Sequence, residues 1–138
     1  MSDLVRLSFS IEQTLVDRLE RLMGEAGYRN RSEFIRDMIR DRIVAMEWKA
    51  NEEVVGTVTL VYDHHVRGLS EKLTDLQHRF QGAVLANTHV HLNHHTCIEA
   101  ILVRGNAETI REVVGLLQQQ KGVLKASLSL ASLGDKLR

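Results

Sequence analysis

The sequence predicts an α+β protein in which a strand-helix-helix module precedes a βαββαβ domain. Two changes of periodicity support this division. Residues 4–10 alternate between apolar and polar side chains, as in a half-buried strand, and the apolar residues that follow recur at helical spacing. From Val54 the pattern changes again, to short strands that alternate with helices. We therefore expect residues 1–50 to form one domain, residues 51–53 a linker and residues 54–138 a second domain.

The N-terminal strand separates apolar and polar residues onto opposite faces. Its apolar face consists of Val5, Leu7 and Phe9. A strand without a neighbour leaves its backbone groups unpaired, so we expect it to pair antiparallel with the same strand of a second chain. The ribbon then presents the polar residues Arg6, Ser8 and Ser10 of each chain, and such a ribbon fits the major groove of DNA. The alternative is that these residues are only the solvated face of an edge strand.

Two helices follow this strand. Ser10 and Gln13 have the spacing of a capping box, and Gly27 ends the first helix. Asn30 and Glu33 have the same spacing before the second helix. Apolar residues form one stripe on each helix: Leu15, Leu19, Leu22 and Met23 on the first, and Phe34, Ile35, Met38, Ile39, Ile43 and Met46 on the second.

The order strand, helix, Gly-Tyr-x-Asn-Arg-Ser-Glu, helix resembles the ribbon-helix-helix repressors. In that family the start of the second helix holds a DNA phosphate through backbone N–H groups and the helix dipole. The resemblance assigns this role to Asn30, Arg31 and Ser32. It assigns base contacts to the strand, where Ser8 stands at a position that is often Thr in the family. A hydroxyl is retained there and a methyl contact is lost, which bears on operator preference.

The second half of the chain alternates strands with helices in the order βαββαβ, a ferredoxin-like arrangement. The expected strands are 54–62, 83–93, 96–104 and 123–130, with one helix between Val66 and Phe80 and another that Asn106 caps.

A histidine-rich stretch, residues 87–97, spans the junction of the second and third of these strands. It holds four of the seven histidines and the only cysteine. His89 and His91 lie on one face of a strand. Cys97 joins them only if an odd number of loop residues places it opposite His91. Two imidazoles and a thiolate suit Ni, Cu or Zn. From these residues alone, a solvent-facing hairpin with Cys97 as a core residue is an equal alternative.

Taken together, the module order and these ligand types resemble the nickel-responsive transcriptional repressors of the NikR family. The sharpest matches are residues 30–37, Leu76-Gln77-His78 and the stretch from His89 to Cys97. The resemblance implies one Ni(II) per subunit, held by His89, His91 and Cys97 of one subunit and His78 of a neighbour. It also implies a homotetramer, a dimer of dimers with a DNA-binding dimer at each end, that binds operator DNA.

The resemblance further implies supporting roles. Gln77 and Glu99 are expected to orient the ligands, although as residue types alone they are equally compatible with solvated side chains. Glu33 and Asp37 lie one helical turn apart and match residues that help bind a weak second cation between the domains. An ordinary acidic helix face is the alternative for this pair. The remaining histidines are expected to be exposed rather than to be ligands: His64, His65, His94 and His95.

Composition narrows the remaining classes. The formal net charge is zero, so DNA binding rests on the local pattern alone. No apolar run approaches the roughly 20 residues that span a membrane, and the N-terminus lacks a signal-peptide core. One cysteine excludes an internal disulfide and fits a reducing cytoplasm.

Two further interpretations remain beside the nickel regulator. In the first, the βαββαβ domain is ACT-like and binds a small molecule such as an amino acid, beside the same ribbon-helix-helix module. The second is a metalloenzyme. We expect a regulator and not an enzyme, because four protein ligands in a square plane leave no open position for catalysis.

Overall fold

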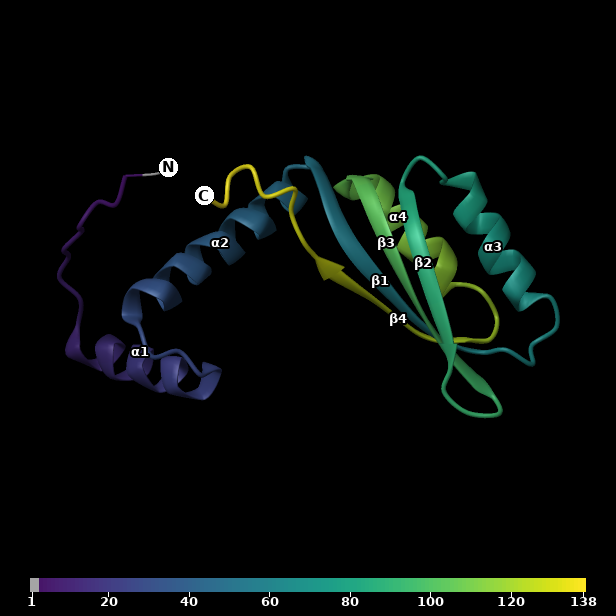
Figure 1. Ribbon diagram of the computed structural model, residues 1–138, viewed down its shortest axis with the longest axis horizontal. Coiled ribbons are helices and arrows are strands. Elements are labelled where there is room, and N and C mark those ends of the chain that lie inside the picture. Colours follow the sequence, from purple (N-terminus) through teal and green to yellow (C-terminus); the bar gives the residue numbers. More distant parts are fainter. Residues whose placement is uncertain (1–2) are drawn as a thin grey trace. The chain divides into compact units, whose positions relative to one another are not determined.

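Residues 3–138, which this computed structural model describes, contain four helices and four strands (Figure 1). The chain divides into two compact units, one of residues up to Ile43 with Lys136–Arg138, the other of Val44–Asp135. The elements in chain order are α1 (Gln13–Ala26), α2 (Arg31–Lys49), β1 (Glu53–Asp63), α3 (Leu69–Arg79), β2 (Val84–His91), β3 (Thr96–Asn106), α4 (Ala107–Gln118) and β4 (Val123–Leu130). None of these described helices is long and apolar enough to cross a membrane.

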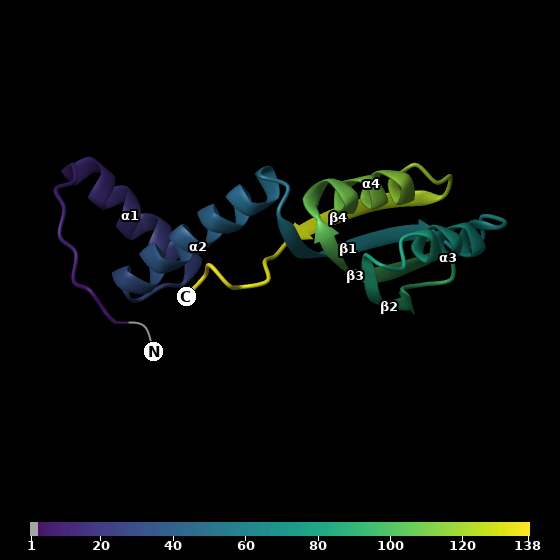
Figure 2. The same cartoon turned by 90° about the horizontal axis from the view of Figure 1, so that it is seen from above.

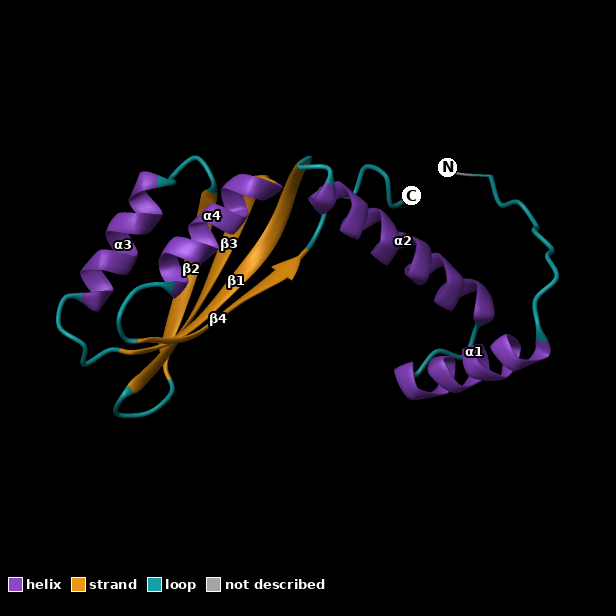
Figure 3. Cartoon of the chain, turned by 180° about the vertical axis from the view of Figure 1, so that it is seen from behind, coloured by secondary structure: helices purple, strands orange, loops and turns teal. Residues whose placement is uncertain are grey.

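The first unit contains α1 and most of α2, preceded by an extended segment. Residues 3–12 form neither helix nor strand in the single chain (Figure 3). The apolar side chains of this segment are exposed, from 68% at Phe9 to 91% at Leu4. A strand needs a hydrogen-bonded neighbour, and the single chain offers none to this segment. The predicted pairing with a second chain therefore stays a prediction.

The predicted capping box at the start of α1 is wrong. The helix begins at Gln13, with Glu12 as N-cap and no side-chain hydrogen bond to the cap. Gln13 is thus the first helical residue instead of the third, and its side chain donates to Asp17 Oδ1 at 2.9 Å. The other end of α1 agrees with the prediction, because Gly27 adopts a left-handed conformation with φ of 79°.

The start of α2 confirms the second predicted cap. Asn30 Oδ1 accepts hydrogen bonds from the backbone N–H groups of Ser32 at 2.8 Å and Glu33 at 3.4 Å. These are donors that the first turn of a helix leaves without a partner inside the helix. Asn30 therefore fixes where α2 begins.

The second unit is the predicted βαββαβ domain. Its sheet has the strand order β2-β3-β1-β4, and every neighbouring pair is antiparallel. Residues along β1 alternate between buried and half-buried, so one face of the sheet is covered. Core side chains of α3 and α4, such as Leu73 and Ile110, join those of β1 and β3, such as Leu60 and Ile101, in one cluster (Figure 2). This is the ferredoxin-like arrangement.

The connection from α2 to β1 also caps α4. Residues 50–52 separate the two elements, close to the predicted linker. Asn51 has a positive φ of 55°, and its Oδ1 accepts a hydrogen bond from the backbone N–H of Glu108 at 2.9 Å. Asn106, the predicted cap, is the N-cap residue of α4 but makes no side-chain cap hydrogen bond. Trp48, near the end of α2, is 2% exposed in the core of the second unit.

Candidate metal centre

The register of the β2–β3 hairpin decides which side chains share a face. His91 pairs with Cys97 and His89 pairs with Glu99, so five residues, 92–96, connect the paired positions. This odd number confirms the predicted parity. The turn is held by Asn93 Oδ1, which accepts hydrogen bonds from the N–H groups of His95 at 2.8 Å and Thr96 at 3.0 Å. The thiol and both histidines therefore lie on one face of the sheet.

Cys97 and His91 are in direct contact. The Sγ of Cys97 lies 3.3 Å from Nδ1 of His91, whichever of the two carries the proton. Cys97 is 1% exposed, while His91 is exposed. The ring of His89 is 6.1 Å from that of His91 between centroids. A thiol that is buried on the protein side and meets an imidazole on the solvent side is accessible to a metal ion from that side.

His64 is the residue that the sequence prediction misplaced. It was expected to be exposed, but it is half-buried directly after β1. Its ligating nitrogen, a ligating nitrogen of His91 and the sulfur of Cys97 all lie within 4.8 Å of one another. The pairing of Tyr62 with Cys97 explains this position, because the end of β1 lies beside the start of β3. The other three histidines outside the predicted ligand set, His65, His94 and His95, are exposed as expected.

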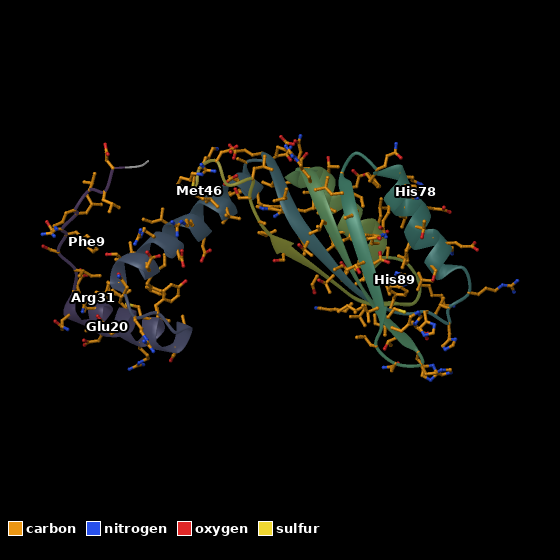
Figure 4. The ribbon with its side chains drawn as sticks, viewed as in Figure 1. Phe9, Glu20, Arg31, Met46, His78 and His89 are labelled. Atoms are coloured by element: carbon orange, nitrogen blue, oxygen red, sulfur yellow. The ribbon has the colours of Figure 1, made fainter. Side chains whose placement is uncertain are left out.

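His78 lies on α3, at a groove that it lines with Gln81, Val84 and Asn87. In the described part of the single chain, the cluster of potential metal ligands comprises His64, His91 and Cys97 and includes neither His78 nor His89. Figure 4 shows His78 on α3 and His89 on β2 well separated. The four predicted ligands therefore do not converge within one chain.

A buried polar chain connects α3 to the two ligand-bearing strands. Gln77 Nε2 donates to Glu99 Oε2 at 2.6 Å, and Asn87 Nδ2 donates to Gln77 Oε1 at 2.6 Å. Gln77 is 5% exposed and Glu99 6%, so neither is the solvated side chain that the alternative describes. Burial raises the pKa of nearby Tyr62 to about 12, and the charges of Glu99 and Cys97 add to the effect. Sequence reasoning missed Asn87, which stands two residues before His89.

The residues that the resemblance assigns to DNA lie in the first unit. Arg6, Ser8 and Ser10 are exposed in the extended N-terminal segment. Arg31 is also exposed, and its Nε donates to Glu20 Oε1 at 2.5 Å (Figure 4). At the start of α2, Asn30 already accepts the N–H of Ser32.

The carboxylates of Glu33 and Asp37 are engaged by arginines. Glu33 forms an ion pair with Arg36, and Asp37 pairs with Arg40 at 2.8 Å. Tyr28 also donates its hydroxyl to Asp37 at 2.5 Å, which is the main reason that the pKa of Asp37 is lowered, and the hydrogen bond from Arg40 adds to it.

Comparison with known proteins places both units. Residues 55–131 match the family described as "NikR C terminal nickel binding domain", and residues 5–45 match "Ribbon-helix-helix protein, copG family". A solved structure of an uncharacterized protein from Thermotoga maritima covers 57% of this chain and 98% of its own, with a TM-score of 0.52. At 19% identity it supports the fold alone.

Relatives match along the whole chain. A protein of Solibacter usitatus is 46% identical over 139 residues and covers 100% of both chains. One from Geotalea uraniireducens is 44% identical over 99% of both chains, and one from Pyrococcus abyssi is 43% identical over 98% of this chain and 99% of its own. Each is described as a "Putative nickel-responsive regulator". The chain therefore belongs to the nickel-responsive regulator family, whose members are regulators rather than enzymes and join a ribbon-helix-helix module to a NikR C-terminal domain.

Proposed function

We propose that this protein is a cytoplasmic repressor that binds operator DNA when Ni(II) occupies a site shared between subunits. The ligands are His89, His91 and Cys97 of one subunit and His78 of its neighbour, with one ion per subunit. The observation that carries this proposal is the 3.3 Å contact of Cys97 Sγ with His91 Nδ1, in a family whose C-terminal domain binds nickel. The same comparisons favour a nickel ion over a small organic effector.

The donor set suits the metal. Imidazole nitrogens and a thiolate are ligands for late transition metals, and the burial of Cys97 keeps competing ligands from one side of the sulfur. Copper binds such donors at least as tightly as nickel by intrinsic order, so metal availability contributes to selectivity. Gln77 is proposed to orient His78, because it is hydrogen-bonded to Glu99 and precedes His78 directly in α3.

A shared site accounts for assembly as a homotetramer. His78 lies outside the ligand cluster of its own chain, and a neighbouring subunit supplies the missing imidazole in this proposal. Nickel then stabilises whichever arrangement of subunits brings His78 to the other ligands. By linkage, it shifts the DNA-binding equilibrium only by its differential affinity for the two arrangements.

The DNA contacts follow from the N-terminal segment. Leu4, Val5, Leu7 and Phe9 are exposed in the single chain, and pairing this segment with its copy in a second chain would bury them. Arg6, Ser8 and Ser10 then face outward and read bases in the major groove. Asn30, Arg31 and Ser32 at the start of α2 hold the phosphate backbone.

Glu33 and Asp37 are proposed to hold a weak second cation. Both carboxylates pair with arginines, so a cation must displace Arg36 and Arg40 to bind there. That competition is a physical reason for weak affinity.

The proposal is tested by equilibrium dialysis of the purified tetramer against nickel, copper and zinc in competition, with operator binding followed in the same samples. One nickel per subunit and operator binding that requires nickel are expected. A protein that binds its operator equally well without metal contradicts the proposal.

A further inference from the structure

His64 stands out among the residues around Cys97 because its side chain has an unmet valence. In the part of the chain that the structure describes, Nε2 of His64 is the buried side-chain nitrogen or oxygen without a hydrogen-bond partner. A buried imidazole nitrogen that neither donates nor accepts a hydrogen bond costs free energy. A metal ion would satisfy this nitrogen where no protein group does.

The backbone holds His64 in position. Its N–H donates to the carbonyl of His95 at 3.0 Å, and the preceding Asp63 donates its N–H to the carbonyl of Gly122 at 2.9 Å. The end of β1 is thus fastened to the β2–β3 turn on one side and to the start of β4 on the other. The ring of His64 meets the ring of His91 nearly edge-on, with centroids 4.8 Å apart and an angle of 82°.

The distances suit a common ion. Metal–nitrogen bonds of about 2.0 Å and metal–sulfur bonds of about 2.3 Å place donor atoms roughly 3–4 Å apart. His91 Nδ1 and Cys97 Sγ are already 3.3 Å apart, and all three donors lie within 4.8 Å of one another. Small rotations of the imidazole rings bring the set into bonding range, and no backbone movement is needed.

We propose that His64, His91 and Cys97 form the first nickel-binding site of each subunit, and that the ion later passes to the four-ligand site. This inference rests on the proposed nickel function. The Cys97 thiol loses its proton to solvent as its sulfur binds the ion. When His89 and the His78 of a neighbouring subunit reach the metal, the bond to His64 breaks, while those to His91 and Cys97 persist.

This assignment gives His64 a role that His65 does not share. His65 is the next residue, but it is exposed, and its Nε2 is hydrogen-bonded to the carbonyl of His94 at 2.8 Å. It lies outside the ligand cluster of the described chain. The two histidines therefore form a matched pair, with one as the candidate ligand and the other as its control.

The test uses the full-length protein with the His78→Ala substitution, which removes the fourth ligand from every subunit. Nickel is titrated while the thiolate-to-nickel absorption in the near ultraviolet and the bound metal are measured. We expect this protein to retain one weaker site per subunit with a thiolate signal. Adding His64→Ala should weaken that site by at least tenfold, and adding His65→Ala should leave it unchanged.

A second measurement follows nickel uptake by the otherwise unaltered chain in a stopped-flow instrument. His64→Ala should slow the appearance of the thiolate signal, while the final stoichiometry stays at one ion per subunit. His64→Asn, which keeps a polar group near His91, should show the same slowing. Circular dichroism confirms that each variant folds.

Several outcomes overturn the inference. Equal nickel affinity of His78→Ala with and without His64→Ala removes His64 from the site, as does unchanged uptake in the single variant. Loss of the residual site on His89→Ala but not on His64→Ala assigns it to His89 instead. These results differ from a failure of the proposed function, in which the unaltered protein binds no nickel at all.

Discussion

Cys97 combines near-complete burial with a sulfur that touches an exposed imidazole. The Cys97→Ser substitution keeps the size of the side chain but replaces the thiolate by a hydroxyl that stays protonated near neutral pH. We expect nickel affinity to fall by orders of magnitude and nickel-dependent operator binding to be lost. Equilibrium dialysis and a mobility-shift assay measure the two effects.

The control for this substitution is the fold itself. Serine fits the space of Cys97, so the oligomeric state without metal and the melting temperature should change little. A Cys97→Ser protein that responds to nickel like the parent would reduce Cys97 to a packed core residue.

Arg6 separates DNA reading from metal sensing. In a paired ribbon, a guanidinium at this exposed position can donate two hydrogen bonds to a guanine edge, worth about 1–3 kcal/mol per base pair discriminated. Two-fold symmetry repeats the loss in the other half-site. Arg6→Ala should therefore weaken operator binding by orders of magnitude and binding to random DNA far less, because phosphate contacts carry the latter.

Both DNAs are titrated at one salt concentration, and bound nickel is counted in the same preparation, where it should not change. Equal losses on operator and random DNA would mean that Arg6 contacts only the backbone. No loss on either would remove the ribbon from the DNA interface.

Residue patterns predicted part of the metal centre and missed part. The parity of the pleat was enough to place Cys97 opposite His91, because both lie on adjacent strands of one hairpin. His64 and Asn87 reach the centre through contacts between elements that are distant in sequence. His64 depends on β1 pairing with β3, and Asn87 on its hydrogen bond to Gln77 in α3. Neither contact has a local sequence signal.

The helices show the same limit at the scale of elements. Asn30 was predicted correctly as a cap, because its bonds are to Ser32 and Glu33 nearby in the chain. The cap of α4 was assigned to Asn106 by the same spacing, yet the hydrogen bond comes from Asn51 in the connection after α2. Tertiary structure had supplied a better acceptor than the adjacent residue.

This exchange of caps makes a stability prediction. Asn51→Ala removes the acceptor for the N–H of Glu108 and also places a residue with Cβ and no compensating hydrogen bond at a positive φ. We expect it to lower the free energy of unfolding by about 1–3 kcal/mol, from a lost cap and from left-handed backbone strain. Chemical denaturation followed by circular dichroism measures the change.

Two variants divide this loss. Asn51→Gly relieves the backbone strain but still lacks the cap, so it should be less destabilising than Asn51→Ala. Asn106→Ala should cost little, because the Asn106 side chain makes no cap hydrogen bond. If Asn106→Ala destabilised the protein more than Asn51→Ala, the capping assignment would be wrong.

At the scale of the whole molecule, the sequence alone divided the chain into a strand-helix-helix module and a βαββαβ domain, and the family matches over residues 5–45 and 55–131 follow this division. What a single chain does not contain is a neighbour. The N-terminal segment has no partner strand within it, and His78 stands apart from its own Cys97. Both features gain a purpose only in an oligomer.

Sharing of ligands between subunits is tested by mixing two inactive variants. A His78→Ala subunit keeps His89, His91 and Cys97, and a Cys97→Ser subunit keeps His78. Each variant alone lacks the four-ligand site. In a mixed pair, the Cys97 of the first subunit and the His78 of the second lie together, so one complete site should form per pair. The opposite site, with both substitutions, should stay inactive.

The two variants carry different affinity tags and are denatured together, refolded and purified through both tags. Nickel binding as tight as in the parent protein should return to half of the subunits. Mixing His78→Ala with a differently tagged copy of itself should restore none. The weaker binding expected of His64 with His91 and Cys97 is separated from the shared site by its affinity. Purified mixed oligomers that regain no tight site would show that His78 does not serve the neighbouring Cys97, because the subunits would be together and the ligands still apart.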